Sequence, residues 1–378
     1  MAFYKYFWDL SASTTYSSHV IGAFDKNTTT GGGIFRWVSG VNNSTISNIP
    51  GIRIKPTNSL TGYWLRSFDG PISVSWFGCQ NGDSIPNTFA QVGVSQLVLD
   101  SYYGPGFATT TDNYDTTAIR YAMKFMDDSL ISTTNIPGLV STSLVFEPKK
   151  YWLTRGVTLP SGLSNINPGM FVIDGNSAQL YKAVNTQFDM FNRYPTGIPQ
   201  SYNFVTKSFT IKNFIANGGT GVWQGSGYSF LTLGSATNCL IENISLDNFD
   251  IGIRMEHCPN SIVRNIRLKS TASYGIRVTS GGWVGATNTG TSSSNFVITD
   301  VEIINTLSTL AHIYVNSVDN LEIEHIRING SPGGGSFVEG IVVDGVSNMG
   351  NKKCRIYDVM ADASITNAVP IWQKSIVT

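Results

Sequence analysis

The sequence contains little charge and no excess of either sign. Lysine plus arginine number 25, aspartate plus glutamate number 25, and charged residues are only 13% of the 378 positions. Because nucleic-acid phosphates are bound by basic patches, this balance argues against a nucleic-acid partner. The sequence also has no apolar run near the ~20 residues that a membrane-spanning helix needs, so we expect no membrane insertion.

Cysteine and histidine are scarce and are not spaced as metal ligands. The four cysteines form no CxxC pair, and His257, His312 and His325 stand apart from one another. We therefore expect no metal site and no cofactor. The first residues, MAFYKYFWDLSAS, lack the apolar stretch and the small-residue cleavage site of an export signal, so we expect synthesis without a signal peptide.

What the sequence does contain is a twelve-residue phrase that recurs six times in its second half. The copies are KSFTIKNFIANG, TNCLIENISLDN, PNSIVRNIRLKS, SNFVITDVEIIN, DNLEIEHIRING and KKCRIYDVMADA. They begin at Lys207, Thr237, Pro259, Ser294, Asp319 and Lys352, which are 22 to 35 residues apart. Repeats at such a period predict a stack in which each unit buries its apolar face against its neighbours.

Each phrase reads as two short strands that meet at a polar bend. Apolar residues alternate at period two, and one apolar column holds Ile211, Ile241, Val263, Ile298, Ile323 and Ile356. The bend column holds Asn213, Asn243, Asn265, Asp300, His325 and Asp358. Asparagine and aspartate suit a bend because they tolerate left-handed backbone angles. For His325 in this column we expect a structural hydrogen bond.

A further short strand follows four of the phrases, at residues 252–255, 275–278, 312–315 and 340–343. Three short parallel strands per turn predict an all-β fold, a right-handed parallel β-helix, over residues 141–378. A β-propeller would need a regular period of roughly 40 to 50 residues, and leucine-rich repeats would need a Leu and Asn pattern that is missing. We expect loops at 218–228, 281–293 and 330–338, where Gly and Ser accumulate.

Two segments precede the solenoid. Residues 1–70 read as a small β-rich module whose aromatic residues form a core or contact a ligand. Residues 71–140 form an opening segment with an amphipathic helix at 115–126, capped by Asp115 or Thr116, which we expect to cover the end of the solenoid.

The cysteines are expected to be buried apolar side chains rather than disulfides. Cys239 and Cys354 occupy one inward column four repeats apart, or roughly 19 Å at the spacing of neighbouring strands. That separation is too large for a disulfide. For Cys79 and Cys258 no bridging partner is indicated either, so the chain has no oxidative staple.

Several segments together resemble the pectate-lyase-like right-handed β-helix proteins, and phage tailspikes in particular. They are VSWFGC from Val74, DTTAI from Asp115, VFEP from Val145, YWL from Tyr151, LPSG from Leu159 and IDGNSAQL from Ile173. The GGGIFRW and TGYWLR segments before them resemble the small leader module of such proteins. The resemblance covers roughly residues 20 to 200 and is specific for fold rather than for chemistry.

The resemblance implies a phage virion protein of the tailspike or tail-fibre type. Expected partners are host cell-surface polysaccharide and other virion tail proteins, and the expected assembly is a homotrimer in the phage tail. Whether such a protein cleaves the glycan stays open. One alternative is a purely structural virion component that uses the β-helix as a rigid spacer. Another is a polysaccharide lyase or glycoside hydrolase, although secreted enzymes of that kind would carry an export signal.

Catalytic residues are not located by the sequence. Hydrolysis of a glycosidic bond needs two carboxylates facing one groove, and Asp247, Asp250 and Glu256 gather around the second phrase. A solvated or structural role explains these three carboxylates equally well.

One outward row is a candidate for ligand binding. Arg254, Arg277 and Tyr314 take the same strand position in successive turns, and Trp283 lies in the longest insertion. Stacked arginines and aromatic rings hold acidic polysaccharide through charge-assisted bonds and ring contacts. The alternative is an ordinary solvated ladder.

Overall fold

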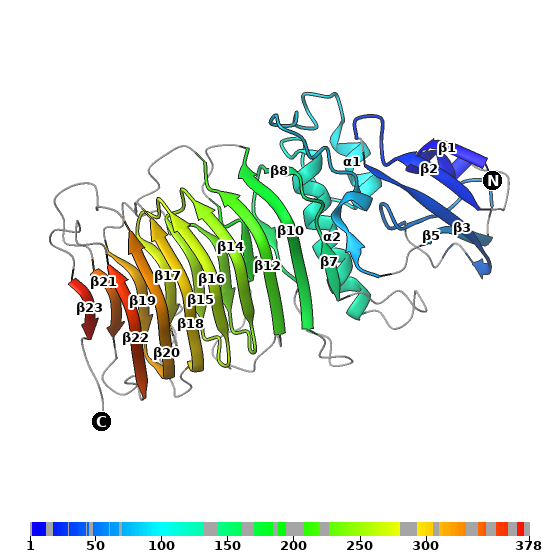
Figure 1. The fold of residues 1–378 in the computed structure, drawn as a ribbon. Helices are drawn as coiled ribbons and strands as arrows, with labels where there is room; N and C mark the ends of the chain where they lie inside the picture. The colour runs from blue at the N-terminus through cyan, green and yellow to red at the C-terminus, as the bar shows by residue number, and fades with distance from the viewer. Residues whose placement is uncertain are drawn as a thin grey trace. The chain divides into compact units, whose positions relative to one another are not determined.

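The computed structural model of the chain (Figure 1) consists of two compact units, Met1–Arg155 and Gly156–Thr378. It describes residues 2–12, 18–28, 30–42, 44, 48–59, 61–67, 70–131, 142–160, 170–183, 188–193, 208–219, 227–279, 293–304, 310–329, 339–344, 353–361 and 369–373. The domain boundaries expected near residues 70 and 140 stay predictions. The expected loops at 218–228, 281–293 and 330–338 lie almost entirely outside the described residues.

The first unit opens with a five-stranded sheet in the order β1-β2-β3-β5-β4. Its strands are β1 (Ala2–Tyr6), β2 (His19–Ala23), β3 (Gly31–Asn42), β4 (Arg53–Ile54) and β5 (Thr61–Arg66), and a 3-10 helix, η1, covers Phe7–Ala12. The aromatic residues of this module pack inward, since Phe7, Phe24, Phe35 and Trp64 are fully buried. Aromatic burial on this scale supplies the core of a small module.

Arg66 shows how this core accommodates a charge. Its guanidinium donates to the carbonyl of Gly31 at 2.7 Å and to that of Gly32 at 2.8 Å, and it stacks 4.8 Å from the ring centre of Phe35. Burial lowers the pKa of Arg66 to about 9. The Arg66 guanidinium is therefore compensated by backbone carbonyls and by an aromatic ring inside the module.

The remainder of the first unit is built around the predicted helix. It contains β6 (Ile72–Ser73), η3 (Val74–Phe77), α1 (Gln96–Tyr103), α2 (Tyr114–Ile131), β7 (Ser143–Val145) and β8 (Lys150–Leu153). Helix α2 packs on η3, β7 and β8, and its predicted apolar face is buried at Ile119, Ala122, Met123 and Met126. The helix is thus confirmed and is longer than expected.

The cap of α2 differs from the prediction. Asn113 caps the helix, because its Oδ1 accepts the backbone N–H of Thr116 at 2.9 Å. Asp115 instead accepts the backbone N–H groups of Gln80, Asn81 and Trp152 at 2.8 to 3.0 Å. The prediction that Asp115 caps the helix is wrong, because its carboxylate binds the backbone of neighbouring loops. Local sequence spacing does not reveal those contacts.

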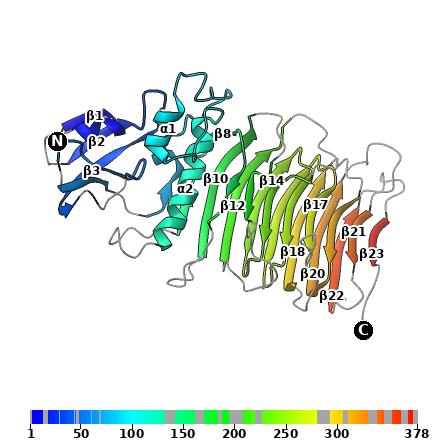
Figure 2. The same cartoon turned by 180° about the vertical axis from the view of Figure 1, so that it is seen from behind.

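The second unit is a parallel β-helix built from two sheets (Figures 1 and 2). The first sheet runs β10 (Met170–Lys182), β12 (Ser208–Asn217), β14 (Leu240–Asp247), β16 (Ile262–Lys269), β18 (Ser293–Ile304), β20 (Val318–Asn329) and β22 (Cys354–Ala361). The second runs β9 (Val157–Thr158), β11 (Phe191–Arg193), β13 (Ser229–Gly234), β15 (Ile251–Glu256), β17 (Tyr274–Thr279), β19 (Ala311–Asn316), β21 (Glu339–Asp344) and β23 (Val369–Gln373). All of these pairings are parallel.

The predicted columns pair in register through the first sheet. Ile211 aligns with Ile241, Ile241 with Val263, and Ile298 with Ile323, and these side chains are fully buried. Ile356 and Cys354 are only half-buried. Both lie on β22, the last strand of this sheet in the described part of the chain, so the expected burial of Cys354 is wrong. The other cysteines, Cys79, Cys239 and Cys258, are buried, and all four are free thiols.

The bends are confirmed by their backbone angles. The six bend residues Asn213, Asn243, Asn265, Asp300, His325 and Asp358 have φ values from 50° to 62°, in the left-handed region. Their side chains also form a ladder, in which the Asn243 amide donates to Asn213 at 3.0 Å and accepts from Asn265 at 2.6 Å. Each phrase is therefore one strand, bent where a residue with a short polar side chain takes a left-handed conformation.

Candidate functional site

The predicted row on the second sheet exists as expected. Arg254 pairs in register with Arg277, and Arg277 pairs with Tyr314, across β15, β17 and β19. All three side chains are half-buried, whereas the residues that continue the row, Thr232 and Val342, are fully buried. Between these two buried residues the row is accessible over three consecutive strands, about 10 Å from first to last. We call Arg254, Arg277 and Tyr314, with the neighbouring Tyr274 and Asn316, the window.

The charge of Arg254 is balanced within its own strand. Its Nε donates to the Glu256 carboxylate at 2.7 Å, and Nη2 approaches the same oxygen. The Glu256 side chain is only 8% exposed and that of Arg254 is 25% exposed. A buried carboxylate without this partner would be costly, so the pair holds both groups in place.

Arg277 has no such acid. Among the described residues no carboxylate lies within 4.0 Å of its guanidinium, and its buried Nε has no hydrogen-bond partner. Its one ring contact is with Tyr274, 5.5 Å from guanidinium carbon to ring centre. Other buried N–H groups, such as the Arg155 Nε and the Trp8 Nε1, also have no partner in the described residues, so the absence of a nearby acid distinguishes Arg277 better than its Nε does.

The aromatic groups of the window lie beside Arg277. The rings of Tyr274 and Tyr314 have centroids 5.5 Å apart at 48°. Asn316 donates to the Tyr314 hydroxyl at 3.0 Å, and that hydroxyl lies 3.4 Å from an Asp344 oxygen. Burial raises the pKa of Tyr314, so its hydroxyl keeps its proton at neutral pH. The window thus combines a cation, two rings and fixed polar groups.

Sequence reasoning missed Tyr274 and Asn316. Tyr274 lies directly before the strand expected at 275–278, and Asn316 lies directly after the strand expected at 312–315, so neither residue was included in the predicted row. The available signal was the aromatic residue directly before Gly275, at a strand end where alternation no longer holds.

Each of the three candidate carboxylates, Asp247, Asp250 and Glu256, contacts a different partner. Asp250 is 1% exposed and accepts from the Ser273 hydroxyl and the Gly227 backbone N–H. Asp247 lies on the first sheet, 3.6 Å from Lys269. Glu256 lies on the second sheet and is held by Arg254. Each carboxylate thus has a structural partner, and their use as a catalytic pair stays an untested expectation.

Two other carboxylates do converge. Glu322 and Glu324 on β20 both lie at hydrogen-bond distance from the Tyr357 hydroxyl, 3.0 Å in the case of Glu322, and are alternative acceptors for its one proton. The adjacent bend residue His325 lies 3.5 Å from Asp300 on one side and 3.5 Å from Asp358 on the other. The expected structural role of His325 in the bend column agrees with these contacts.

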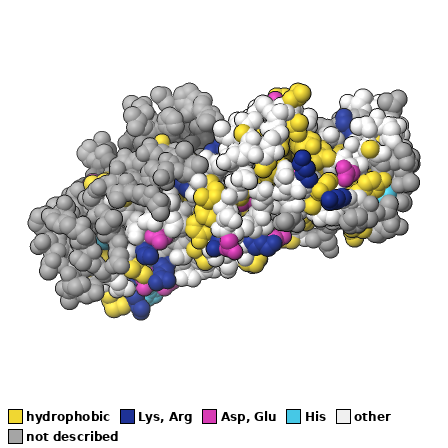
Figure 3. Space-filling view, turned by 90° about the horizontal axis from the view of Figure 1, so that it is seen from above, with side chains coloured by type: hydrophobic (Ala, Val, Ile, Leu, Met, Phe, Trp, Pro, Cys, Tyr) yellow, Lys and Arg dark blue, Asp and Glu magenta, His cyan; other side chains and the backbone are white. Residues whose placement is uncertain are grey.

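Elsewhere the outer face of the first sheet carries opposite charges on neighbouring strands. Arg264 donates to Glu242 at 2.8 Å, and Arg267 lies 3.2 Å from Glu302. In Figure 3 several of the described basic side chains on the face shown lie beside acidic ones. Such ladders of opposite charge compensate themselves and leave little charge for a ligand.

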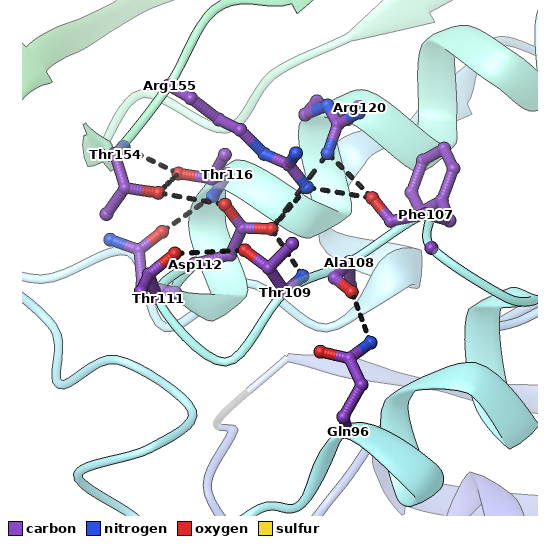
Figure 4. A network of polar contacts seen from close by, with 12 residues as sticks. Gln96, Phe107, Ala108, Thr109, Thr111, Asp112, Thr116, Arg120, Thr154 and Arg155 are labelled. Atoms are coloured by element: carbon purple, nitrogen blue, oxygen red, sulfur yellow. Dashed lines mark hydrogen bonds and ion pairs between the residues drawn. The ribbon is translucent and has the colours of Figure 1, made fainter.

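A buried polar network in the first unit joins its charged groups to one another, although the Arg155 Nε has no hydrogen-bond partner among the described residues (Figure 4). Asp112, 1% exposed, accepts the Thr109 backbone N–H at 2.8 Å and pairs with Arg155, and Arg120 lies 3.9 Å away. Both arginines also donate to the Phe107 carbonyl at 2.8 Å. Burial, and then the Arg155 charge, lower the pKa of Arg120 to about 10. The network ties the segment before α2 to the strands that follow the helix.

The described part of the chain contains few other groups suited to catalysis or to metal binding. It contains no group of three or more His, Cys, Asp or Glu side chains placed to hold a metal. Burial raises the pKa of the Cys239 thiol to about 11 and lowers that of His312 to about 4. Within the described ranges, no helix is both long and apolar enough to cross a membrane. Trp283 lies outside the described residues.

Comparisons with known proteins find likeness in structure alone. No protein-family model matches the chain. No curated protein sequence matches it either. The enzymatically active domain of tailspike protein 2 from bacteriophage CBA120 is similar over 97% of this chain and 55% of its own length, with 11% identity and a TM-score of 0.47.

Two further solved structures are similar at the same level. The tailspike protein of Acinetobacter baumannii phage AM24 matches over 98% of this chain and 61% of its own, with 14% identity and a TM-score of 0.46. PfbA, a surface adhesin of Streptococcus pneumoniae, matches over 79% and 74%, with 13% identity and a TM-score of 0.46. The chain spans little more than half the length of the tailspikes, and its parallel β-helix is established by its own strand pairing.

Proposed function

We propose that the chain is a virion protein of the phage tailspike or tail-fibre type that contacts host surface polysaccharide through the window. The observation that supports this best is Arg277, a half-buried arginine that lacks an acidic partner in the described structure and adjoins two tyrosine rings. Aromatic faces accept sugar rings, and a guanidinium binds carboxylate or phosphate through paired hydrogen bonds.

The sequence resemblance to tailspikes supports the same function independently. It rests on residues in the first unit and at the start of the second, far along the chain from the window. We further propose that the protein is a homotrimer held by other tail proteins, because cyclic symmetry suits a fibre on a symmetric tail. Light scattering at micromolar concentration tests this assembly, and a monomer that binds no tail protein contradicts it.

Binding is better supported than cleavage. Glu256, at one edge of the window, is engaged by Arg254, and the converging Glu322 and Glu324 lie on the other sheet. A glycosidase needs two carboxylates on either side of one bond, roughly 5 to 9.5 Å apart. The two carboxylates beside the window, Glu256 and Asp344, lie three strand spacings apart in one register row, or roughly 14 Å between their backbones, which is farther than a glycosidase pair.

The test is to incubate the purified chain with surface polysaccharides of candidate host bacteria. We expect binding that the tyrosine and arginine residues of the window support. New reducing ends would add hydrolysis, and new ultraviolet absorbance from unsaturated uronates would add lyase activity. If no polysaccharide is bound or cleaved, the proposed function is wrong.

The self-paired charges of the first sheet favour a second candidate. A β-helix whose outer charges are mutually compensated, as Arg264 is by Glu242 and Lys269 by Asp247, suits a rigid spacer between other virion parts. A spacer binds no glycan, so the same incubation separates the two functions.

A further inference from the structure

The two arginines of the window differ in what they offer a ligand. Both Nε and Nη2 of Arg254 contact the same oxygen of Glu256, so the pair carries almost no net charge. Arg277, its neighbour in register on β17, has no carboxylate within 4.0 Å in the described part of the chain. The uncompensated positive charge of the row is therefore at its centre.

The surroundings of Arg277 limit where a ligand group can lie. Glu256 is bound by Arg254, and Asp344 lies at the far side of the window, 3.4 Å from the Tyr314 hydroxyl. Fully buried Thr232 and Val342 close the row at both ends. A ligand is therefore confined to the strands that carry Arg254, Arg277 and Tyr314.

We infer that Arg277 is the specificity-determining residue of the window and selects a glycan that carries a carboxylate or phosphate group. The anionic group lies against the Arg277 guanidinium, and the sugar ring that carries it lies beside Tyr274 and Tyr314. This inference rests on the proposed function. It goes further in predicting unequal roles for two arginines that sequence spacing treats alike.

Three Arg→Gln variants provide a matched test. Arg277→Gln removes the free charge, Arg254→Gln removes a charge already paired, and Arg264→Gln on the first sheet is a control distant from the window row and paired with Glu242. We expect Arg277→Gln to weaken binding about 10- to 100-fold, the range of a charge-assisted hydrogen bond. Arg254→Gln should weaken it less, and Arg264→Gln should leave it unchanged.

Stability should follow the opposite order. Arg254→Gln leaves the buried Glu256 carboxylate without its partner and should lower Tm by a few degrees. Arg277→Gln removes an N–H that has no partner and should leave Tm nearly unchanged. A merely structural Arg277 would show the reverse, with a lower Tm and unaltered binding.

The probe is an array of purified bacterial surface polysaccharides, each in its native form and with its uronate carboxyls reduced or its phosphates removed. We expect the wild-type chain to bind anionic glycans. Neutralising the glycan should weaken its affinity by about the same factor as the Arg277→Gln substitution does. Binding that Arg277→Gln leaves unaltered, or binding to neutral forms alone, overturns the inference and leaves the proposed function standing. Absence of binding to any glycan overturns the proposed function itself, and the inference with it.

Discussion

Replacing Asn243 tests whether the bends of the β-helix are set by backbone conformation or by the amide ladder. Asn243 has φ 55°, donates to Asn213 at 3.0 Å and accepts from Asn265 at 2.6 Å. Asn243→Gly keeps a residue at ease in the left-handed region but removes both amide bonds. Asn243→Ala removes the same bonds, and it keeps the β-carbon without the short polar side chain that lets asparagine tolerate the left-handed conformation.

The magnitudes follow from those two effects. The side chain is exposed, so each lost hydrogen bond should cost near the lower end of the usual range, about 0.5 kcal/mol, or about 1 kcal/mol for both. The left-handed conformation adds about 1 to 2 kcal/mol for alanine. We therefore expect Asn243→Gly to lower the free energy of unfolding by about 1 kcal/mol and Asn243→Ala by about 2 to 3 kcal/mol.

Denaturant unfolding followed by circular dichroism measures both variants against the wild-type chain. Ser245→Ala on the same strand, at a half-buried outward position, is the control and should change stability by less than about 0.5 kcal/mol. Equal losses in the alanine and glycine variants would show that backbone conformation does not select asparagine here. A glycine variant as stable as the wild type would remove any role for the ladder.

Two further predictions concern the solenoid interior. Burial lowers the pKa of His312 from its ordinary 6.5 to about 4. Between these two pH values the His312 imidazole is therefore protonated in the unfolded chain and neutral in the folded chain. Stability should fall by up to about 3 kcal/mol between pH 6.5 and 4, and His312→Gln should flatten that part of the pH profile. Ile241→Ala in the buried column should cost about 2 to 5 kcal/mol, whereas Ile215→Ala, 44% exposed, should cost less than about 0.5 kcal/mol, and similar losses would contradict the assigned faces.

The features that could be read from the sequence are those set by local backbone physics. Alternation placed Ile211 and Ile241 inside, and the residue type at Asn213 and Asn243 marked the left-handed bends. Both signals recur in every turn, so the repeat amplifies them. Hence the parallel β-helix is confirmed from a single sequence.

The parts that escaped prediction depend on partners that are not local. Asn113 rather than Asp115 caps α2 because distant loops occupy the aspartate. The row of Arg254, Arg277 and Tyr314 was predicted from equivalent strand positions. Which of its arginines is charge-compensated depended on rotamers, which spacing alone does not fix.

The most direct test of glycan contact at the window is hydrogen–deuterium exchange of the whole chain, with and without a polysaccharide that it binds. Slowed exchange is predicted in β15, β17 and β19 around Arg277, with no change in β14, β16 and β18 of the first sheet. Protection confined to the outer face of the first sheet, or to the first unit, would contradict the window as the site of contact.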